Sequence, residues 1–529
     1  FKPDVIVNRF DHRSPGNTHG HHTGSAMLSV EAFDLANDAT LYPEQLKYTQ
    51  PWQPKRLFFN TSWWFYGSEE NFAKADKTNL LSLEVGYFYP HLGLSNSEIA
   101  ALSRSKHSSQ GFGSSGSRGS ETEYLEYLKG DFPKDKTNIF EGVNTTWTRV
   151  KNGEHIAGIL LDVEKNFNFK DPSVHIPQLV QAYQLIEKID DAHWHSIKSE
   201  EIKNIIAQCA GLYLEAVAGN ASASPGEKVS LKIEAINRSA ATVVLKDIIV
   251  NPTKGFLSVN KPLENNKFNA FNLDVQIVEN QAYTSPYWLM EPGTLGMYAV
   301  NDPLLIGRPV TDRAVTVTFN LIVNNSVIPI TRNVLFKFTE PSKGEIYQPF
   351  EVLPPATVSI ANNVTIFADG NPKKVPVKVK AGLAGVSGEV SIKIPEGWVV
   401  SPASEPFNIS RKGEESTYWF TISPPKNENV GLVVPQVTIK GQTIAKKLVE
   451  MDYGHIPKQS VLLPSDAKVV RLNLEKAGEN IGYIAGAGDE VPESLRQIGY
   501  NVVLIDAETL DAQLLSRFDA VVLGIRAYN

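Results

Sequence analysis

Cysteine is almost absent from this chain of 529 residues, in which Cys209 is the only one. A single thiol excludes a disulfide bond within the chain and excludes a zinc site built from cysteines. It fits the bacterial cytoplasm and the periplasm equally well, so cysteine content does not separate the two compartments.

Long runs of one residue type are also missing. No stretch approaches the about 20 apolar residues of a spanning helix, so we expect no membrane span. The formal net charge is −7 and Lys and Arg form no long run, which predicts neither a nucleic-acid surface nor an anionic-membrane surface. The chain has no initiator Met, and strand-like residues lie close to both ends. We therefore expect both ends to be cut, with any signal peptide in the missing N-terminal part.

The remaining composition is that of a folded protein with several domains. Hydrophobic residues make up 42% and charged residues 21% of the chain, and the length predicts three or four domains. The hydrophobic period predicts a multidomain fold in the following order: an α/β region over 1–130, a helical hairpin linker over 131–212, two immunoglobulin-like β-sandwiches over 213–345 and 346–452, and a truncated, doubly wound α/β domain over 465–529.

A histidine cluster near the N-terminus is the strongest candidate site. His19 and His22 lie in the polar segment Thr18–Ala26, after an apolar strand at 5–7 and before a helical pattern that begins near residue 26. Open α/β sheets place ligands at the carboxyl ends of their strands. A spacing of three puts two imidazoles on one side of a helix or tight turn, where they can bind a metal or move a proton. Two interpretations stand, a metal or proton-transfer site and an ordinary polar loop.

Other residues of this region have two interpretations each. Arg9 and Asp11 flank the loop and either contact substrate hydroxyls or form a local salt bridge. An aromatic-rich stretch, which contains Trp63 and Trp64, either stacks on sugars or packs in the core.

Two motifs resemble the PIG-L/LmbE-like zinc-dependent N-deacetylases. The segment from Asp4 to Ala26, with His19-Gly20-His21-His22, is similar to the second histidine motif of that family, which usually reads His-Pro-Asp-His. The segment Leu102–Gln110 resembles the family's helix that ends in His-x-Ser-Gln. The resemblance covers residues 1 to about 130 and implies a Rossmann-like α/β fold.

The resemblance implies a role for each motif residue. His22 matches the zinc ligand, and His19 matches the histidine that stabilises the tetrahedral intermediate or protonates the amine. His107 and Gln110 follow a helix and either face the substrate pocket or cap that helix; the resemblance favours the pocket. Gly20 and His21 replace the family's Pro and Asp, so the orienting carboxylate is absent. His21 either takes over part of the function of that carboxylate or is a surface residue, and we favour the surface residue.

The family's first motif, His-Pro-Asp-Asp-Glu, is not found in this chain. It supplies further zinc ligands and the general base, so we expect the chain to hold half of the site and to be inactive alone. The implied activity is zinc-dependent hydrolysis of an N-acetyl group on an amino sugar or related glycoconjugate.

The later regions carry weaker resemblances. Residues 356–449 are similar to NPCBM-associated and CARDB-like sandwiches, which accompany secreted bacterial carbohydrate enzymes, and this favours a periplasmic or secreted protein. Residues 478–529 resemble the start of a class I glutamine-amidotransferase-like domain. The alternative hypothesis is a non-catalytic carbohydrate-binding or adhesion protein with a degenerate α/β domain.

Overall fold

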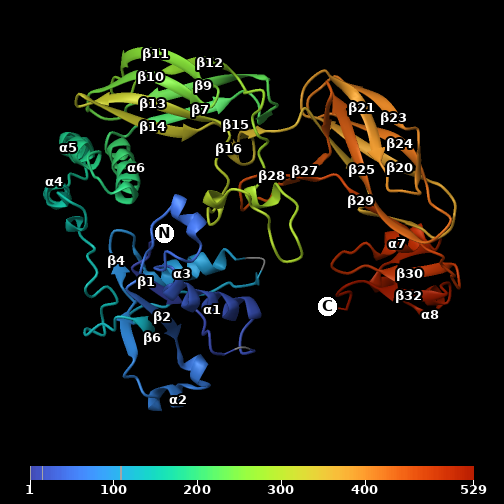
Figure 1. The fold of residues 1–529 in the computed structure, drawn as a ribbon, viewed down its shortest axis with the longest axis horizontal. Coiled ribbons are helices and arrows are strands. Elements are labelled where there is room, and N and C mark those ends of the chain that lie inside the picture. Colours follow the sequence, from blue (N-terminus) through green and yellow to red (C-terminus); the bar gives the residue numbers. More distant parts are fainter. Residues whose placement is uncertain (1, 15, 108–109, 529) are drawn as a thin grey trace. The chain divides into compact units, whose positions relative to one another are not determined.

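A computed structural model describes residues 2–14, 16–107 and 110–528 of the chain. The chain divides into two compact units, Phe1–Gly158 with Ile189–Asp191 and Ile159–Lys188 with Ala192–Asn529 (Figure 1). Several separate sheets supply most of the regular structure. The prediction of a multidomain, β-rich protein is therefore confirmed.

The first unit is organised around a four-stranded sheet with the order β1-β2-β6-β3. Its strands are β1 (Val5–Asn8), β2 (Arg56–Thr61), β6 (Thr122–Gly130) and β3 (Leu80–Glu84). β1 and β2 are parallel, whereas β6 runs antiparallel to β2 and β3. The sheet is therefore mixed, and its buried core is small, with Phe58, Leu81 and Leu125 at the centre.

Helix α1 (Gly20–Leu35) follows β1 and packs on this sheet. It begins six residues before the predicted helix start, so His21 and His22 lie in its first turn rather than in a loop. Gly, His and Ser are poor helix formers, and propensity alone argues against this start. Burial of Thr23, Ala26 and Phe33 on one face of the helix offsets that cost.

Helix α3 (Asn96–Ser105) is capped by Ser95. The sequence alone predicts Asn96 or Ser97 as the cap, because either side chain can accept a hydrogen bond from a free backbone amide. The Ser95 hydroxyl accepts a hydrogen bond from the Glu98 amide, and the Glu98 carboxylate accepts one from the Ser95 amide. This reciprocal capping box satisfies two free amides at once, which explains the shift. Three short elements complete this part of the unit: α2 (Glu69–Lys74), β4 (Phe88–Tyr89) and β5 (Leu94–Ser95).

The linker region is helical, as predicted. It contains α4 (Gly153–Lys165), α5 (Ile176–Ile186) and α6 (Ala192–Cys209). α5 and α6 pack against each other as the expected hairpin, and Pro177 lies in the first turn of α5, where its missing N–H costs nothing. The apolar spacing over 199–213 predicts a helix that reaches Tyr213, but α6 ends at Cys209 and Tyr213 already begins β7.

Two sheets follow the helical hairpin. One has the order β11-β10-β13-β14 and the other β12-β9-β7-β15-β16. The strands are β7 (Tyr213–Ala218), β9 (Lys228–Ile236), β10 (Val243–Asn251), β11 (Gly255–Pro262), β12 (Ala270–Gln276), β13 (Thr316–Val323), β14 (Ser326–Asn333), β15 (Leu335–Glu340) and β16 (Gly344–Pro349). β9 and β13 alternate buried and less buried residues, as an antiparallel strand with one covered face should.

A second pair of sheets shares one continuous core, in which Phe367, Val390, Phe420 and Val437 are fully buried. Its first sheet has the order β18-β20-β24-β22 and its second β19-β29-β25-β21-β23, with β26 paired to β25. The strands are β18 (Ala356–Ile360), β19 (Val364–Phe367), β20 (Lys373–Ala381), β21 (Val386–Lys393), β22 (Val399–Ser401), β23 (Ser404–Ile409), β24 (Glu415–Ser423), β25 (Asn429–Ile439), β26 (Gln442–Ile444) and β29 (Ala467–Arg471).

The position of β29 shows that one predicted domain boundary is wrong. The sequence predicts a return to α/β structure directly after Pro464, but β29 lies between β19 and β25 in the preceding sheet. Two small pairings accompany these sheets, β8 (Ser222–Ala223) with β17 (Glu351–Val352) and β27 (Lys446–Met451) with β28 (Gln459–Pro464).

The last segment has the predicted α/β pattern. β30 (Asn480–Ile484), β31 (Asn501–Ile505) and β32 (Ala520–Leu523) form a parallel sheet with the order β31-β30-β32. Helices α7 (Val491–Gln497) and α8 (Ala512–Leu515) connect the strands. Among the described helices, none is long and apolar enough to cross a membrane.

Candidate functional site

His19 and His22 lie at the start of α1, where His19 is the N-cap residue and His22 is in the first turn. The loop from β1 leads into this turn, so both histidines follow a strand of the parallel pair β1–β2. The ring centroids of His19 and His22 are 5.7 Å apart and tilted by 60°. The structure therefore brings the two predicted site histidines together after the carboxyl end of β1, and the carboxyl ends of parallel strands are the usual place for a ligand in an α/β protein.

The ring of His22 is held by an aromatic neighbour that the sequence analysis did not single out. Phe10 stacks on it with a centroid distance of 4.0 Å and an interplanar angle of 11°. Burial lowers the pKa of His22, and the nearby His21 and His19 lower it further. Both effects favour the neutral imidazole, which is the form that binds metals.

His21 has a different position. It lies at the surface, and its ring centroid is 4.2 Å from that of His22. A helix turns by about 100° per residue, so His21 points to the side of α1 opposite Thr23 and Ala26, which are buried. This is the position of a surface residue.

An ion-pair network fixes the loop before the histidines. Arg13 donates two parallel hydrogen bonds to the Glu126 carboxylate, at 2.9 and 2.8 Å, and its Nε donates to Asp11 at 2.8 Å. Burial raises the pKa of Asp11, but hydrogen bonds from Arg13 and Ser14 outweigh it and the net pKa is lowered. The hydrogen bonds to Glu126 raise the pKa of the Arg13 guanidinium. Asp11 thus takes part in a local salt bridge, which was one of its two interpretations.

Arg9 belongs to a second polar chain across the same sheet. Its guanidinium donates to the side-chain oxygen of Asn60, and the Asn60 amide donates to Glu123 at 2.7 Å. Asn60 lies on β2 and Glu123 on β6. These contacts direct Arg9 toward the end of β2 and link the loop to two further strands.

Asn8 is a candidate site residue that the sequence pattern does not indicate. It is the last residue of β1 and only 8% exposed, yet its Nδ2 finds no acceptor within the described residues. A buried amide donor needs a hydrogen-bond partner, so Asn8 has a free donor for an oxygen atom at the edge that carries His19 and His22. The only sequence signal was a polar residue at the end of an apolar strand.

The second motif lies beyond α3. His107 and Gln110 are exposed, and the Gln110 amide donates to the His107 carbonyl at 3.0 Å. The intervening Ser108 and Ser109 lie outside the described residues. No hydrogen bond, ion pair or ring contact joins His107 or Gln110 to the histidines of α1 in the described part of the chain.

The fit to zinc is incomplete. Residues 2–14, 16–107 and 110–528 contain no group of three His, Cys, Asp or Glu side chains placed to hold a metal ion. Catalytic zinc sites commonly use three protein ligands. The two imidazoles at the start of α1 therefore do not complete a zinc site, and no carboxylate from the loop joins them because Asp11 is bound to Arg13.

The tryptophans of the aromatic-rich stretch lie in two places, before β2 and after it. Trp52 precedes β2, and its indole N–H donates to the Pro3 carbonyl at 2.7 Å. Trp63 and Trp64 follow β2 in the short 3-10 helix η2 (Trp63–Tyr66) and are 48% and 51% exposed. Of these three tryptophans, Trp63 and Trp64 follow the carboxyl end of β2, the strand parallel to the one that leads to the histidines.

Comparisons with known proteins do not identify a family. No family model and no curated protein matches the chain. Similar solved structures include WR4, an MSP family member from C. elegans, with 8% identity, a TM-score of 0.14 and coverage of 22% of this chain and 97% of that one. The native conformation of alpha-2-macroglobulin from E. coli has 12% identity, a TM-score of 0.17 and coverage of 49% of this chain and 16% of that one.

A family 123 glycoside hydrolase from Clostridium perfringens has 12% identity and a TM-score of 0.15, over 25% of this chain and 30% of that one. Such low TM-scores carry no argument about function. The functional assignment therefore rests on the site itself.

Proposed function

We propose that the protein is a zinc-dependent N-deacetylase that hydrolyses the N-acetyl group of an amino sugar or a related glycoconjugate. The observation that supports this most is the placement of His19 and His22 together at the carboxyl edge of β1 and β2, with ring centroids 5.7 Å apart. The resemblance of the two histidine motifs to the PIG-L/LmbE-like enzymes supplies the reaction type.

In this proposal His19 is the catalytic residue. Water adds to the acetyl carbonyl carbon, the C–N bond breaks, the amine leaves with a proton and acetate is released. His19 is exposed at the start of the helix, where it can donate a hydrogen bond to the oxyanion and a proton to the leaving amine. Asn8, whose Nδ2 has no partner among the described residues, is suited to donate a hydrogen bond to a substrate oxygen.

His22 is the proposed metal ligand. Its lowered pKa and its fixed position against Phe10 suit a neutral ligand. Zinc, when bound, supplies a Lewis acid and an activated water. Because the described residues do not complete its coordination, the remaining ligands belong, in this proposal, to an upstream His-Pro-Asp-Asp-Glu motif.

The other predicted contacts remain part of the proposal. Arg9 and Asp11 line the loop before the histidines, and His107 and Gln110 stay predicted substrate contacts. The proposed partner is an amino-sugar glycan, and the proposed location is periplasmic or secreted.

The finer fold assignment is also a proposal. We infer that the first unit contains a partial Rossmann-like deacetylase domain, and the parallel pair β1–β2 with α1 supports this. The two pairs of sheets, with alternating burial along their strands, support two immunoglobulin-like sandwiches. The parallel order β31-β30-β32 supports the start of a glutamine-amidotransferase-like domain.

Zinc binding tests the role of His22. The chain and its His22→Ala variant are titrated with zinc, and His155→Ala, at an exposed position on α4, is the matched control. We expect His22→Ala to weaken zinc binding and His155→Ala to leave it unchanged. Tight stoichiometric binding that survives His22→Ala would overturn the assignment.

Amine release from N-acetylglucosamine oligomers tests His19 in the natural protein. Loss of an oxyanion donor or general acid lowers kcat by about 10²–10³-fold, and we expect a loss of that size for His19→Gln with zinc content unchanged. An unchanged kcat contradicts the proposed role.

A second candidate function is glycan binding without catalysis. The half-exposed Trp63 and Trp64 at the end of β2 favour it, because aromatic faces stack on sugars. It predicts oligosaccharide binding that is lost in Trp64→Ala and is indifferent to His19→Gln, together with no amine release.

A further inference from the structure

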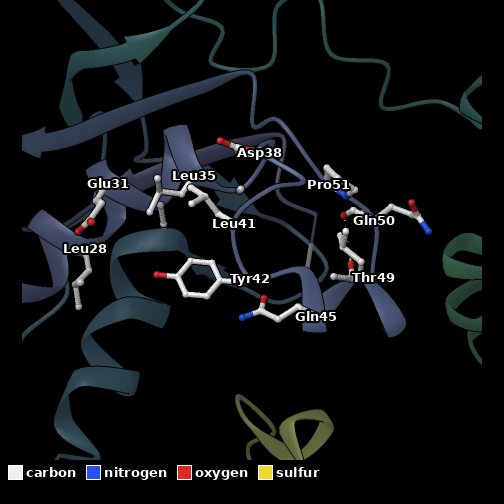
Figure 2. Close-up of a pocket in the computed structure, with 13 residues that line it drawn as sticks. Leu28, Glu31, Leu35, Asp38, Leu41, Tyr42, Gln45, Thr49, Gln50 and Pro51 are labelled. Carbon is white, nitrogen blue, oxygen red and sulfur yellow. Dashed lines mark hydrogen bonds between the residues drawn. The ribbon is translucent and has the colours of Figure 1, made fainter.

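A cavity of about 490 Å³ lies against α1 in the first unit. Leu28, Ala32 and Leu35 of α1 form one wall, and the segment that follows the helix forms the other (Figure 2). Spacings of four and three place these residues on one helix face. At about 100° per residue that face is opposite Ala26 and Phe33, which pack on the sheet. The cavity is therefore separate from the face of α1 that carries His22.

Apolar side chains line most of the cavity and remain accessible. Leu28 is 66% exposed, and across from it Leu41 is 39% and Tyr42 57% exposed. Figure 2 shows the Tyr42 side chain extending from the loop toward the helix that carries Leu28 and Glu31. Exposed apolar surface of this kind, gathered in a concave site of ligand size, is characteristic of binding sites.

The charge of the cavity has one sign. Glu31 and Asp38 line it, and among the described residues that line it there is no Lys, Arg or His. Hydrogen bonds from the Thr40 side chain and backbone hold the pKa of Asp38 below its usual value, so this carboxylate is ionised at neutral pH. Glu31 forms no ion pair or side-chain hydrogen bond with any described residue. An unpaired carboxylate at an apolar wall is complementary to a cation attached to an apolar body.

We propose that this cavity binds a small organic ammonium ligand, in which a protonated amine is attached to an apolar body. The apolar body contacts Leu28 and Leu35, and the ammonium group pairs with Glu31. The face of Tyr42 offers a cation–π contact to the same group. This site does not depend on the proposed deacetylase activity, because none of its residues belongs to the histidine site.

Three probes with one hydrocarbon body test the proposal: hexylamine, 1-hexanol and hexanoate. Each is titrated into the chain, and binding is followed by isothermal titration calorimetry and by ligand-observed NMR. We expect saturable binding with the order hexylamine, hexanol, hexanoate from tightest to weakest. We also expect 1 M salt to reduce the preference for hexylamine over hexanol, because exposed ion pairs are screened.

Two variants that each remove one negative charge locate the site. Glu31→Gln removes a carboxylate that lines the cavity. Glu44→Gln removes a carboxylate that does not line it, from the neighbouring 3-10 helix η1 (Pro43–Lys47). An exposed ion pair contributes a few-fold in affinity, so we expect Glu31→Gln to weaken hexylamine binding about threefold. Hexanol binding and the Glu44→Gln variant should be unchanged.

Several results would overturn the proposal. They are hexylamine binding no tighter than hexanol, non-saturable binding of all three probes, and equal affinities of the Glu31→Gln and Glu44→Gln variants for hexylamine. Leu35→Ala provides a second check, because it shortens the apolar wall without changing charge. It should weaken hexylamine and hexanol alike.

Discussion

Arg13 is expected to hold the loop that leads to the candidate site, and Arg13→Met tests this. The guanidinium donates two hydrogen bonds to Glu126 and one to Asp11. The side chains of Glu126 and Asp11 are only 13% and 11% exposed, whereas that of Arg13 is 47% exposed. Methionine keeps the length of the aliphatic stem but leaves two carboxylates close to each other without a cation.

The size of the effect lies between two limits. Removing one partner from a fully buried ion pair costs about 3–5 kcal/mol, and an exposed pair contributes about 0.2–1 kcal/mol. The half-exposed guanidinium weakens the interaction by solvent screening, while the mostly buried carboxylates strengthen it. We therefore expect Arg13→Met to destabilise the loop and β6 by about 2 kcal/mol, which corresponds to about thirtyfold faster opening.

Hydrogen–deuterium exchange measures this locally, which matters because a chain of several domains does not unfold in one step. Peptides that cover β1, the start of α1 and β6 should exchange about thirtyfold faster in Arg13→Met. Arg118→Met is the matched control, because Arg118 is 74% exposed and pairs with Glu98 at 2.9 Å. We expect this variant to change exchange by less than about fivefold.

The pH dependence has a definite sign. The pKa of Asp11 is lowered in the folded chain, so its contribution to stability is present above the unfolded pKa and is lost as pH falls through the folded value. The difference between wild type and Arg13→Met should therefore shrink as the pH falls below about 4. Equal exchange in Arg13→Met and Arg118→Met at neutral pH refutes the reasoning.

Two further predictions concern buried side chains. Phe58 is fully buried, so Phe58→Ala should lower the free energy of unfolding of the first unit by about 3–5 kcal/mol. The control Phe140→Ala, at a site 49% exposed, should change this free energy by about 0.5 kcal/mol or less. Denaturant titration measures both. Burial raises the pKa of Glu351, and Arg313 only partly opposes this. Because the folded pKa lies above the unfolded one, the charge destabilises the fold increasingly as pH rises above about 4.5. Glu351→Gln should thus gain thermal stability relative to wild type between pH 4 and 8, and a constant difference in Tm over that range contradicts this.

The sequence predicts those elements whose burial pattern is local. Alternation over Val229–Ile236 gives strand β9, because one covered face imposes a period of two. The apolar spacing within Ile176–Ile186 gives α5 in the same way. From Asn480 to Leu523, apolar strands alternate with helices. This alternation predicts that the strands of the last sheet are parallel, because parallel strands need crossover connections.

Contacts between residues that are distant in the sequence determine the features that no local hydrophobic pattern predicts. Glu126 pairs with Arg13 over a separation of 113 residues, and no local spacing indicates that partner. β29 joins the preceding sheet through pairing with β19 and β25, which lie about 100 and 35 residues earlier in the chain, although Pro464 marks a boundary in the sequence. The unpaired Nδ2 of Asn8 is likewise a consequence of what the fold packs around the end of β1.

The histidine site shows the same division. By itself the sequence determines that His19 and His22 are three residues apart, after a strand and before a helix, because these are properties of neighbouring residues. Only the tertiary structure decides that the helix begins at Gly20, that Phe10 stacks on His22, and that Arg13 rather than a ligand engages Asp11. These features depend on the free energy of contacts between segments that are distant in the sequence. Such contacts form only in the folded chain, so the local sequence does not determine them.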